Sequence, residues 1–427
     1  MQVSTAVQAL EILKDNDVIW CQSMAATPYK LLEGLAEVAM QRRNLTLLQL
    51  HTEHSEVLCD PALQGHLRQR AFFVGASTRA AVQQGLADYV PIFLSEIPKL
   101  FRSGEQPLDA VLIQVSPPDA HGNCSLGISV EATRAALQVA RKVIAWINPM
   151  MPRTHGDSFV PLARFDRYFE QAAPLPLHGL PELDPVSQQI GERVAALIDD
   201  GDCLQMGIGA IPNATLACLG NHRDLGIHTE MFSDGILPLV ASGVINNSRK
   251  RKHRGRIVTT FAMGSQALYD FVDDNPSVAF LDVEYTNDTS VIRQNKQVMS
   301  INSALQVDLS GQVCADSLGT KIYSGVGGQM DFVRGASLSE GGRSVIALPA
   351  TACGGKVSRI SSMLAPGSGV VTTRAHVHYI VTEYGVANLK ARSLTERATA
   401  LIAIAAPQFR QQLAREAYDQ WGLKVST

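Results

Sequence analysis

The stretch CLQMGIGAIPNATLACLGNHRDLGIHTEMFSDG, residues 203–235, indicates the class of fold. Its apolar start, Cys203 to Met206, predicts a short buried strand, and the glycines that follow predict a turn. Asn213 to Leu219 then predicts a short helix, and Leu225 to Thr229 predicts a second strand. Together they form a strand–helix–strand unit, whose crossover should be right-handed.

The rest of the chain alternates helices and strands in the same manner. Pro28 to Met40 and Leu394 to Arg415 have helical periodicity, and Asp184 caps a further helix with Pro185 at its first position. Strands are predicted at Leu45 to Leu50, Ala71 to Gly75, Val90 to Phe93, Asp109 to Val115, Val143 to Ile147, Ile257 to Thr260, Val278 to Leu281, Val345 to Leu348 and Val377 to Thr382. Nearly continuous apolar strands are expected in a sheet that is covered on both faces. The pattern therefore predicts an α/β protein with largely parallel sheets.

Two similar units are indicated by the length and by a weak internal repeat. The 427 residues suffice for two or three domains. Each half contains a proline followed by a helix and then a strand that ends in His-Thr-Glu, at 51–53 and at 228–230. The proline-rich stretch from Gln171 to Pro185 lacks periodicity and predicts a linker. We therefore predict two similar open α/β domains, residues 1–180 and 181–427.

The composition excludes several classes of protein. Hydrophobic residues make up 46% of the chain and charged residues 18%, as in a soluble globular protein with a large core. A net charge of -3 gives no overall field that would recruit nucleic acid or an anionic membrane. The seven cysteines are scattered and include no Cys-x-x-Cys pair, so a reducing compartment is expected. With no signal-peptide pattern and no run near ~18 apolar residues, we expect a cytoplasmic protein without a membrane span.

The motif Gly207-x-Gly209-x-x-Pro212 lies where a predicted strand becomes a helix. Glycines let a ligand approach the backbone closely, and a helix N-terminus favours an anion. One interpretation is a dinucleotide fingerprint, with Glu230 about 20 residues later on a ribose hydroxyl. Pro212 replaces the third glycine of that fingerprint, which allows close packing of helix on strand. A nicotinamide-dependent dehydrogenase is therefore kept as an alternative.

Two glutamates, Glu230 and Glu383, follow predicted strands. An open α/β sheet forms its ligand crevice at the carboxyl ends of its strands, so either carboxylate is well placed for chemistry. Glu230 lies between a predicted strand and the Ser233-Asp234-Gly235 turn. It could be a nucleophile or an ordinary capping or ion-paired carboxylate. The residues alone do not choose between Glu230 and Glu383.

Three other patterns in the sequence could carry a function. The loop SGVGGQ, residues 324–329, has amides that could converge on a developing oxyanion, or it is a glycine-rich hairpin without function. His51, His54 and Cys59 suggest a metal site, but no later His or Cys pair completes it, so no metal is expected. The basic run from Arg249 to Arg256 predicts a solvated loop, with contact to ligand phosphates or RNA as the alternative.

Several stretches carry a resemblance to a known family. They are VSPPD at 115–119, HGNCS at 121–125, MPRTHG at 151–156, and longer runs at 207–214, 228–235, 321–336 and 378–388. The chain resembles the acetyl-CoA hydrolase/transferase family of class I CoA-transferases, closest to the 4-hydroxybutyrate and butyrate CoA-transferase type. The resemblance covers nearly the whole chain. It implies two NagB/CoA-transferase-like α/β domains with the active site in the cleft between them.

The resemblance also implies roles for particular residues. It puts the catalytic glutamate at Glu230 rather than at Glu383, and Asn302 near the CoA thioester. The implied CoA-binding turn comprises Gly207, Ile208, Gly209, Ala210 and Ile211. The implied oxyanion loop comprises Gly325, Gly327 and Gly328. It further implies coenzyme A as a substrate, no permanently bound cofactor, and a homo-oligomer that is a dimer or tetramer. Cys353 and His376 depart from the family pattern, so the acyl group is left open.

The implied reaction moves CoA between a short-chain acyl-CoA and a carboxylic acid such as acetate, by a ping-pong mechanism. Glu230 would attack the thioester to give an acyl-glutamyl anhydride and CoA thiolate. The thiolate would then attack the glutamyl carbonyl to give a glutamyl-CoA thioester and the free acid. A glutamyl-CoA thioester keeps the free energy that a serine ester would lose. The alternatives are an acyl-CoA hydrolase on the same scaffold and a non-catalytic CoA-binding or RNA-binding protein.

Overall fold

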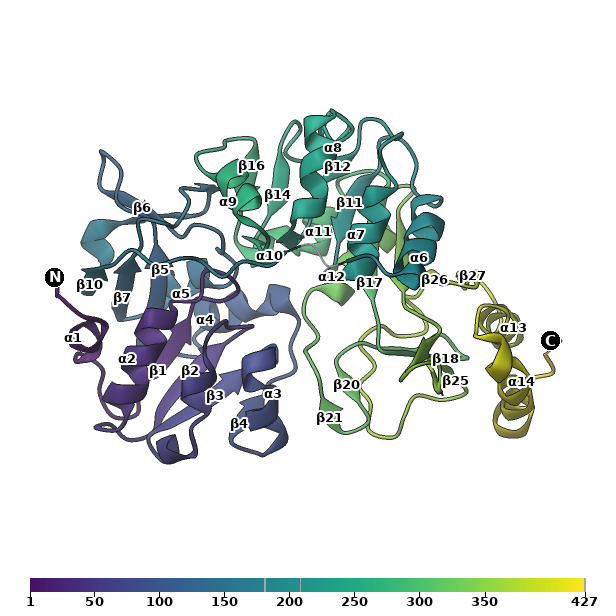
Figure 1. Cartoon of the computed structure of the whole chain (residues 1–427), viewed down its shortest axis with the longest axis horizontal. Coiled ribbons are helices and arrows are strands. Elements are labelled where there is room, and N and C mark those ends of the chain that lie inside the picture. The colour runs from purple at the N-terminus through teal and green to yellow at the C-terminus, as the bar shows by residue number, and fades with distance from the viewer. Residues whose placement is uncertain (180–181, 208, 426–427) are drawn as a thin grey trace.

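The computed structural model of the chain describes residues 1–179, 182–207 and 209–425. We call residues 1–179 the N-terminal half and residues 182–425 the C-terminal half. Each half contains one large sheet, and the two chain ends lie at opposite ends of the molecule (Figure 1). The predicted boundary, between residues 180 and 181, lies outside the described residues. No helix in the described ranges is long and apolar enough to cross a membrane.

The sheet of the N-terminal half has seven strands in the order β10-β7-β5-β1-β2-β3-β4, and all its pairings are parallel. Its strands are β1 (Val18–Cys21), β2 (Leu45–Gln49), β3 (Leu67–Ala71), β4 (Ala87–Tyr89), β5 (Ala110–Val115), β7 (Lys142–Ile147) and β10 (Arg167–Glu170). Its helices are α1 (Ala6–Leu10), α2 (Tyr29–Ala39), α3 (Ala76–Gln83), α4 (Ile97–Ser103) and α5 (Thr133–Val139). Neighbouring strand residues point to opposite faces, so Ile19 packs with α1 and α2 while Trp20 packs with α4 and α5. Both faces are covered, which explains the continuous apolar runs.

The sheet of the C-terminal half has six strands in the order β12-β11-β17-β22-β26-β27, and only the β26–β27 pairing is antiparallel. Its strands are β11 (Cys203–Met206), β12 (Gly226–Ile227), β17 (Val298–Ser303), β22 (Arg343–Ala347), β26 (Tyr379–Thr382) and β27 (Gly385–Asn388). Its larger helices are α6 (Pro185–Ala195), α7 (Ala210–Ala217), α12 (Gln329–Leu338), α13 (Leu394–Ala403) and α14 (Pro407–Trp421). The predicted strand–helix–strand unit is β11–α7–β12, with parallel strands. The prediction of an α/β protein with two largely parallel sheets is confirmed.

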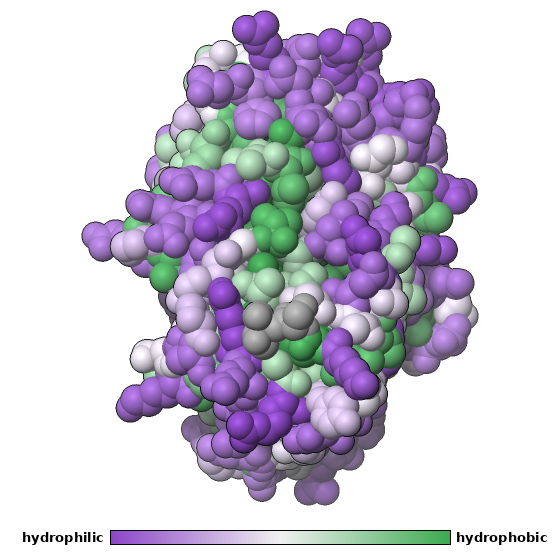
Figure 2. Space-filling view, turned by 90° about the vertical axis from the view of Figure 1, so that its right-hand side faces the viewer, coloured by the Kyte–Doolittle hydropathy of each residue, from purple (hydrophilic) through white to green (hydrophobic). Residues whose placement is uncertain are grey.

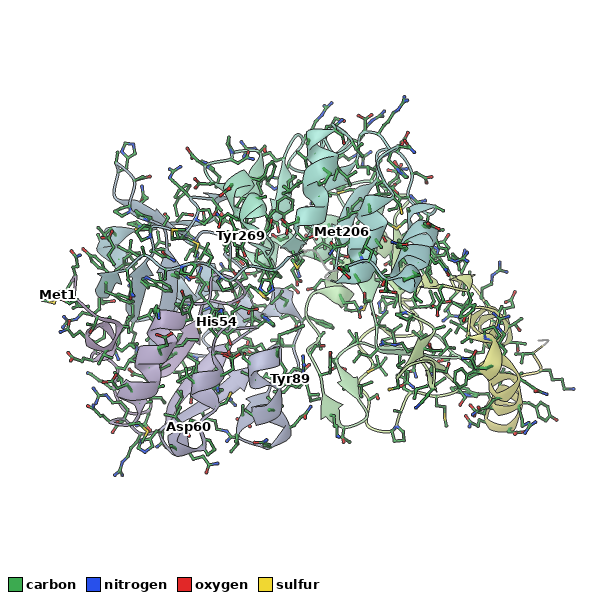
Figure 3. All side chains as sticks on the ribbon, in the orientation of Figure 1. Met1, His54, Asp60, Tyr89, Met206 and Tyr269 are labelled. Atoms are coloured by element: carbon green, nitrogen blue, oxygen red, sulfur yellow. The ribbon has the colours of Figure 1, made fainter. Side chains whose placement is uncertain are left out.

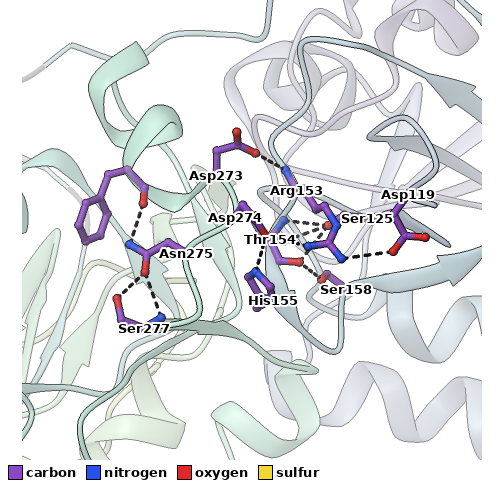
Figure 4. A network of polar contacts seen from close by, with 11 residues as sticks. Asp119, Ser125, Arg153, Thr154, His155, Ser158, Asp273, Asp274, Asn275 and Ser277 are labelled. Carbon is purple, nitrogen blue, oxygen red and sulfur yellow. Dashed lines mark hydrogen bonds and ion pairs between the residues drawn. The ribbon is translucent and has the colours of Figure 1, made fainter. Parts of the chain in front are cut away.

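A joint of smaller elements connects the two halves. Strand β8 (His155–Gly156) of the N-terminal half pairs with β16 (Val278–Phe280), which in turn pairs with β14 (Ile257–Thr259). Gly156 has φ +113°, and a Cβ there would clash with the carbonyl oxygen of Phe280. Polar contacts extend the joint (Figure 4): the Arg153 guanidinium donates to Asp274 at 2.7 Å and to Asp119 at 3.2 Å. The motif MPRTHG therefore forms part of a connection between the halves.

Two predicted strands were placed wrongly. The strands predicted at Ala71 to Gly75 and Val90 to Phe93 are β3 and β4, which end before most of those residues. The helical periodicity from Leu394 to Arg415 corresponds to two helices, because Pro407 begins α14 and cannot continue α13. By contrast, Asp184 caps α6 as predicted, accepting hydrogen bonds from the amides of Val186 and Ser187 at 3.0 Å each.

The side of the molecule that carries α13 and α14 is shown in Figure 2, where apolar side chains are exposed among polar ones. Exposed large apolar residues of the C-terminal half include Val357, Met363, Tyr384, Val386 and Leu394. The homo-oligomer stays a prediction.

Candidate active site

A cavity of about 400 Å³ lies between the two halves of the chain. The N-terminal half lines it with mostly apolar side chains, among them Met24, Leu50, Phe72 and Phe73. The C-terminal half contributes Gln205, Met206, Gly207, Glu230, Asn302 and the loop from Ser324 to Gln329. Met206 ends β11 and lies near the middle of the molecule (Figure 3). Because the carboxyl ends of parallel strands meet at one edge of a sheet, β11 and β17 deliver their last residues to this cavity.

Glu230 lies between β12 and the short strand β13 (Met231–Phe232). Its backbone carbonyl accepts hydrogen bonds from the amides of Thr260 at 3.0 Å and Phe261 at 3.2 Å, and from the Thr259 hydroxyl at 2.9 Å. The residue before it, Thr229, donates its amide to Val258 at 3.0 Å. These bonds to one neighbouring segment fix the main chain at Glu230, which leaves its side chain to face the cavity.

The Glu230 carboxylate is partly buried and has one side-chain donor. Its Oε2 accepts a hydrogen bond from Nδ2 of Asn287 at 2.8 Å, and the same nitrogen donates to Oδ2 of Asp331 at 3.2 Å. Burial raises the pKa of Glu230 to about 7, and the nearby Asp331 carboxylate adds to this, while the Asn287 hydrogen bond opposes it. Burial likewise raises the pKa of Asp331 to about 7. Across the described ranges no Lys, Arg or His pairs with Glu230.

The loop from Gly325 to Gly328 lies against this carboxylate. A Cβ on Gly328 would clash with Oε2 of Glu230 and Nδ2 of Asn287, so any larger residue there would have to displace these side chains. A Cβ on Gly325 would lie 2.8 Å from Cδ2 of Phe73, which belongs to the N-terminal half. The predicted glycine loop therefore touches both the carboxylate and the opposite wall of the cavity.

Backbone contacts anchor the glycine loop to the N-terminal half. Gly327 forms a parallel bridge with Phe93, and the amide of Leu94 donates to the Gly327 carbonyl at 3.1 Å. The amide of Val74 donates to Ser324 at 3.1 Å. Gly328, the residue after Gly327, also lines the cavity. Gly328 is also the N-cap of α12, and a helix N-terminus carries a partial positive charge.

Asn302 is the last but one residue of β17 and hydrogen-bonds Gln205 of β11, and both line the cavity. Nδ2 of Asn302 donates to Oε1 of Gln205 at 3.0 Å, and Nε2 of Gln205 donates to Oδ1 of Asn302 at 3.2 Å. Nδ2 of Asn302 also donates to the Ser300 hydroxyl at 2.9 Å. The side chain predicted to lie near the thioester is thus held in a fixed orientation at the cavity wall.

The predicted CoA-binding turn is only partly at the cavity. Gly207 lines it, whereas Gly209, Ala210 and Ile211, which are also described, do not. Gly209 has φ +114° and is the N-cap of α7, so the turn does present a helix N-terminus. Ile208 lies outside the described residues.

Of the other candidates, His51 lines the cavity, whereas Glu383 and Cys59 do not in the described part of the chain. Oε2 of Glu383 accepts a hydrogen bond from the amide of Ala350 at 2.8 Å. Of the residues considered as metal ligands, His51 pairs with Glu53 at 2.6 Å, and the Cys59 thiol donates to the Ser77 carbonyl.

The basic run is partly structural rather than a wholly solvated loop. Lys250 is 3% exposed, and its ammonium donates to the carbonyls of Ile227 and Arg256 at 2.6 Å each. Arg249 pairs with Asp224 at 3.3 Å, and Arg251 pairs with Glu340 at 3.7 Å. The run therefore fastens β12 and its surroundings.

Sequence reasoning missed Asn287, which bonds to Glu230, and it missed Asp331 and Ser95, which continue that hydrogen-bond network. Asp331 follows the glycine loop by only three residues, and that proximity is a usable signal. Asn287 lies 57 residues after Glu230, and no local pattern marks it.

Comparisons with known proteins agree with the fold. The profile of the acetyl-CoA hydrolase/transferase N-terminal domain matches residues 1–178, and that of the C-terminal domain matches residues 264–417. The 4-hydroxybutyrate coenzyme A transferase of Clostridium kluyveri is 47% identical over 96% of each chain. The butyryl-CoA:acetate CoA-transferase of Anaerostipes caccae is 36% identical over 97% of this chain and 96% of its own.

A solved structure shows the same arrangement. The crystal structure of a 4-hydroxybutyrate CoA-transferase from Porphyromonas gingivalis is 35% identical, covers 98% of both chains and superimposes with a TM-score of 0.83. These similarities extend over nearly the whole chain, and they confirm the prediction of a CoA-transferase. The chain belongs to the acetyl-CoA hydrolase/transferase family.

Proposed function

We propose that this protein moves coenzyme A between a short-chain acyl-CoA and a carboxylic acid by a ping-pong mechanism, with Glu230 as the nucleophile. One observation carries the proposal. The Glu230 carboxylate faces a cavity between the halves, lies against Gly328, and has a neutral amide rather than a cation as its side-chain partner. A carboxylate without a countercharge is poorly stabilised as an anion, and so it is a better nucleophile than one in water.

The chemistry uses four balanced steps. Glu230 attacks the acyl-CoA carbonyl carbon, and the thioester bond breaks to release CoA thiolate and leave an acyl-glutamyl anhydride. The thiolate attacks the glutamyl carbonyl, which releases the first acid and leaves a glutamyl-CoA thioester. A second carboxylate attacks the glutamyl-CoA carbonyl, and the thioester bond breaks to give a new acyl-glutamyl anhydride and CoA thiolate. The thiolate then attacks the acyl carbonyl of this anhydride, which forms the new acyl-CoA and releases the Glu230 carboxylate. No proton transfer is required, so no dedicated general base is needed.

Each tetrahedral step places negative charge on a former carbonyl oxygen. Backbone amides at the N-terminus of α12 are suited to stabilise it, and Gly328 is the strongest candidate among Gly325, Gly327 and Gly328. Asn302 lines the same cavity, but both hydrogens of its amide already bond to Gln205 and Ser300, so we assign it the role of shaping the wall. We assign the nucleotide and pantetheine of CoA to the side on which Gly207 and the start of α7 lie.

The acyl group would pack against apolar side chains of the cavity. Met24, Leu50, Phe72 and Phe73 suit a short aliphatic chain, and a closed apolar surface also keeps water from the anhydride. The relatives named above act on 4-hydroxybutyrate and butyryl-CoA, which fit this size class. An acyl-CoA hydrolase is the alternative outcome. It would consume acyl-CoA at the same rate without a carboxylate acceptor.

The test is a covalent adduct. The protein is incubated with butyryl-CoA or acetyl-CoA without acceptor, and its intact mass and peptide map are measured. We expect the mass of CoA less water on Glu230, discharge of that adduct by acetate, and no adduct in Glu230→Gln. Glu383→Gln is the matched control and should form the adduct normally. An adduct on another residue, or normal transfer by Glu230→Gln, would contradict the proposal.

A further inference from the structure

The Asn287 side chain joins two carboxylates. It follows the short helix α10 (Val283–Thr286) and is 1% exposed. Its two Nδ2 hydrogens match two acceptors, Oε2 of Glu230 at 2.8 Å and Oδ2 of Asp331 at 3.2 Å. The reversed amide would turn its oxygen toward both carboxylates, so the orientation is determined. Within the described residues, Oδ1 of Asn287 is buried without a hydrogen-bond partner. An unpaired buried oxygen costs free energy, and the two hydrogen bonds of the nitrogen offset that cost.

Asp331 is in turn held by the other half of the molecule. It lies in the first turn of α12 and is 7% exposed. Oδ1 accepts a hydrogen bond from the Ser95 hydroxyl at 2.9 Å, and Oδ2 accepts from the Ser95 amide at 3.3 Å. Ser95 belongs to the segment Phe93–Ser95 that also anchors Gly327. One segment of the N-terminal half therefore sets the place of both the glycine loop and Asp331.

The reaction changes the charge at only one of these carboxylates. Free Glu230 is an anion, whereas the acyl-glutamyl anhydride and the glutamyl-CoA thioester are neutral at that side chain. A negative charge on Asp331 destabilises the free carboxylate and leaves both covalent forms unaffected. The repulsion therefore favours attack by Glu230, and it acts strongly because the site is buried.

We propose that Asp331, fixed by Ser95 of the N-terminal half, is a positioning residue that orients and activates Glu230 through the Asn287 side-chain amide. The inference rests on the proposed nucleophilic role of Glu230. The titratable groups that face the pair are Glu230 and Asp331 themselves and Glu96, which faces Asp331 from the segment that carries Ser95. Burial raises the pKa of both carboxyls; the charge of Asp331 adds to the rise at Glu230, and the charge of Glu96 adds to the rise at Asp331.

The experiment measures the pH dependence of kcat/KM for butyryl transfer in Asp331→Asn. The neutral side chain removes the repulsion, so the pKa of Glu230 falls and the acidic limb moves to lower pH, by about one unit. The limiting kcat should fall on the order of tenfold, since the free carboxylate is no longer destabilised. The KM for butyryl-CoA should change little, because Asp331 does not line the cavity in the described part of the chain.

Two further variants test the links. Asn287→Ala should lose on the order of 100-fold in kcat through misplacement of Glu230. Ser95→Ala should shift the acidic limb in the same direction as Asp331→Asn, and Ser95→Thr, which keeps the hydroxyl, should restore the original profile. Asp270→Asn, at an exposed position of α9 (Gln266–Val272), is the control and should match the unmodified protein.

The outcomes separate the two proposals. If Glu230→Gln transfers CoA normally, the proposed function fails and this inference fails with it. If Glu230→Gln is inactive while folded Asp331→Asn and Ser95→Ala keep the original kcat and pH profile, this inference alone is overturned. Ser95 is partly exposed, so we expect its variants to fold. They therefore test the inference even if Asn287→Ala does not fold.

Discussion

At the scale of single residues, the Glu230 carboxylate sits where its ionisation costs stability. Its pKa is raised from an ordinary value of 4.5 to about 7, so between these values the folded state binds more protons than the unfolded state. The stabilising contribution of the protonated group is complete below pH 4.5 and is lost as the pH rises through 7. Glu230→Gln, which is neutral and of similar shape, should therefore stabilise the fold at pH 8 by on the order of 1 kcal/mol and change little at pH 4.

Denaturant unfolding of the two proteins at pH 4 and pH 8 measures this difference. Glu105→Gln, at an exposed position, should show no such dependence on pH. An equal gain from Glu230→Gln at both pH values would mean that the fold does not perturb this carboxylate. The same variant should be inactive. The carboxylate would then be needed for activity although it lowers the stability of the fold.

The choice between Glu230 and Glu383 shows what residue types alone could not predict. Both follow strands and both were plausible before the resemblance was considered. The two carboxylates have different surroundings in the structure. Glu230 lines the cavity and accepts a hydrogen bond from the Asn287 side-chain amide, whereas Glu383 accepts one from the backbone amide of Ala350. Asn287 escaped prediction because its partner is 57 residues away, and only the fold brings the two together.

At the scale of elements, the glycine loop requires the absence of a side chain at one position. A Cβ on Gly328 would overlap Oε2 of Glu230, so Gly328→Ala must displace either the carboxylate or the start of α12. A displacement of ~1 Å at the reacting atom typically costs on the order of 100-fold in rate. We expect that loss in kcat/KM, measured by thioester exchange, with a small change in melting temperature. Gly220→Ala, where no atom lies within 4 Å of the added Cβ, should leave the activity unchanged. Normal turnover by Gly328→Ala would remove this loop from the site.

The two misplaced strands have one physical cause. Phe72, Phe73 and Ile92 follow β3 and β4, and they are apolar because they line the cavity rather than because they lie in a sheet. Strand β3 itself alternates buried and exposed residues, with Arg68 and Arg70 exposed, so its apolar signal is weak. Hydrophobicity identified the strand–helix–strand unit at β11–α7–β12 well, where sequence and burial agree. It failed where apolar residues line the cavity.

At the scale of the whole molecule, the site is a product of the contact between the halves. The C-terminal half supplies the carboxylate and the glycine loop, while the N-terminal half supplies the apolar wall and the segment that anchors the loop. Neither half contains a complete cavity. Arg79 of α3 reinforces this contact: its Nε donates to the Tyr323 carbonyl at 2.8 Å, and its guanidinium lies 4.0 Å from the centre of the Tyr323 ring.

Arg79 therefore tests whether the activity depends on the contact between the two halves. Arg79→Ala should lower the free energy of unfolding by less than about 1 kcal/mol, because the contact is partly exposed. It should still lower kcat/KM by on the order of tenfold, since the glycine loop loses a hydrogen bond at Tyr323, two residues before Gly325.

The variant Arg79→Lys separates two explanations, because it keeps the charge but loses the planar stacking. If Arg79 acts by attracting the phosphates of CoA, the lysine variant will retain activity; if it acts by fastening the loop, the lysine variant will resemble Arg79→Ala. Arg70→Ala, which removes an exposed arginine from the neighbouring β3, is the control and should be silent in both measurements. Unchanged kinetics in Arg79→Ala would show that the remaining contacts of the glycine loop, at Val74 and Leu94, hold it in place without this side chain.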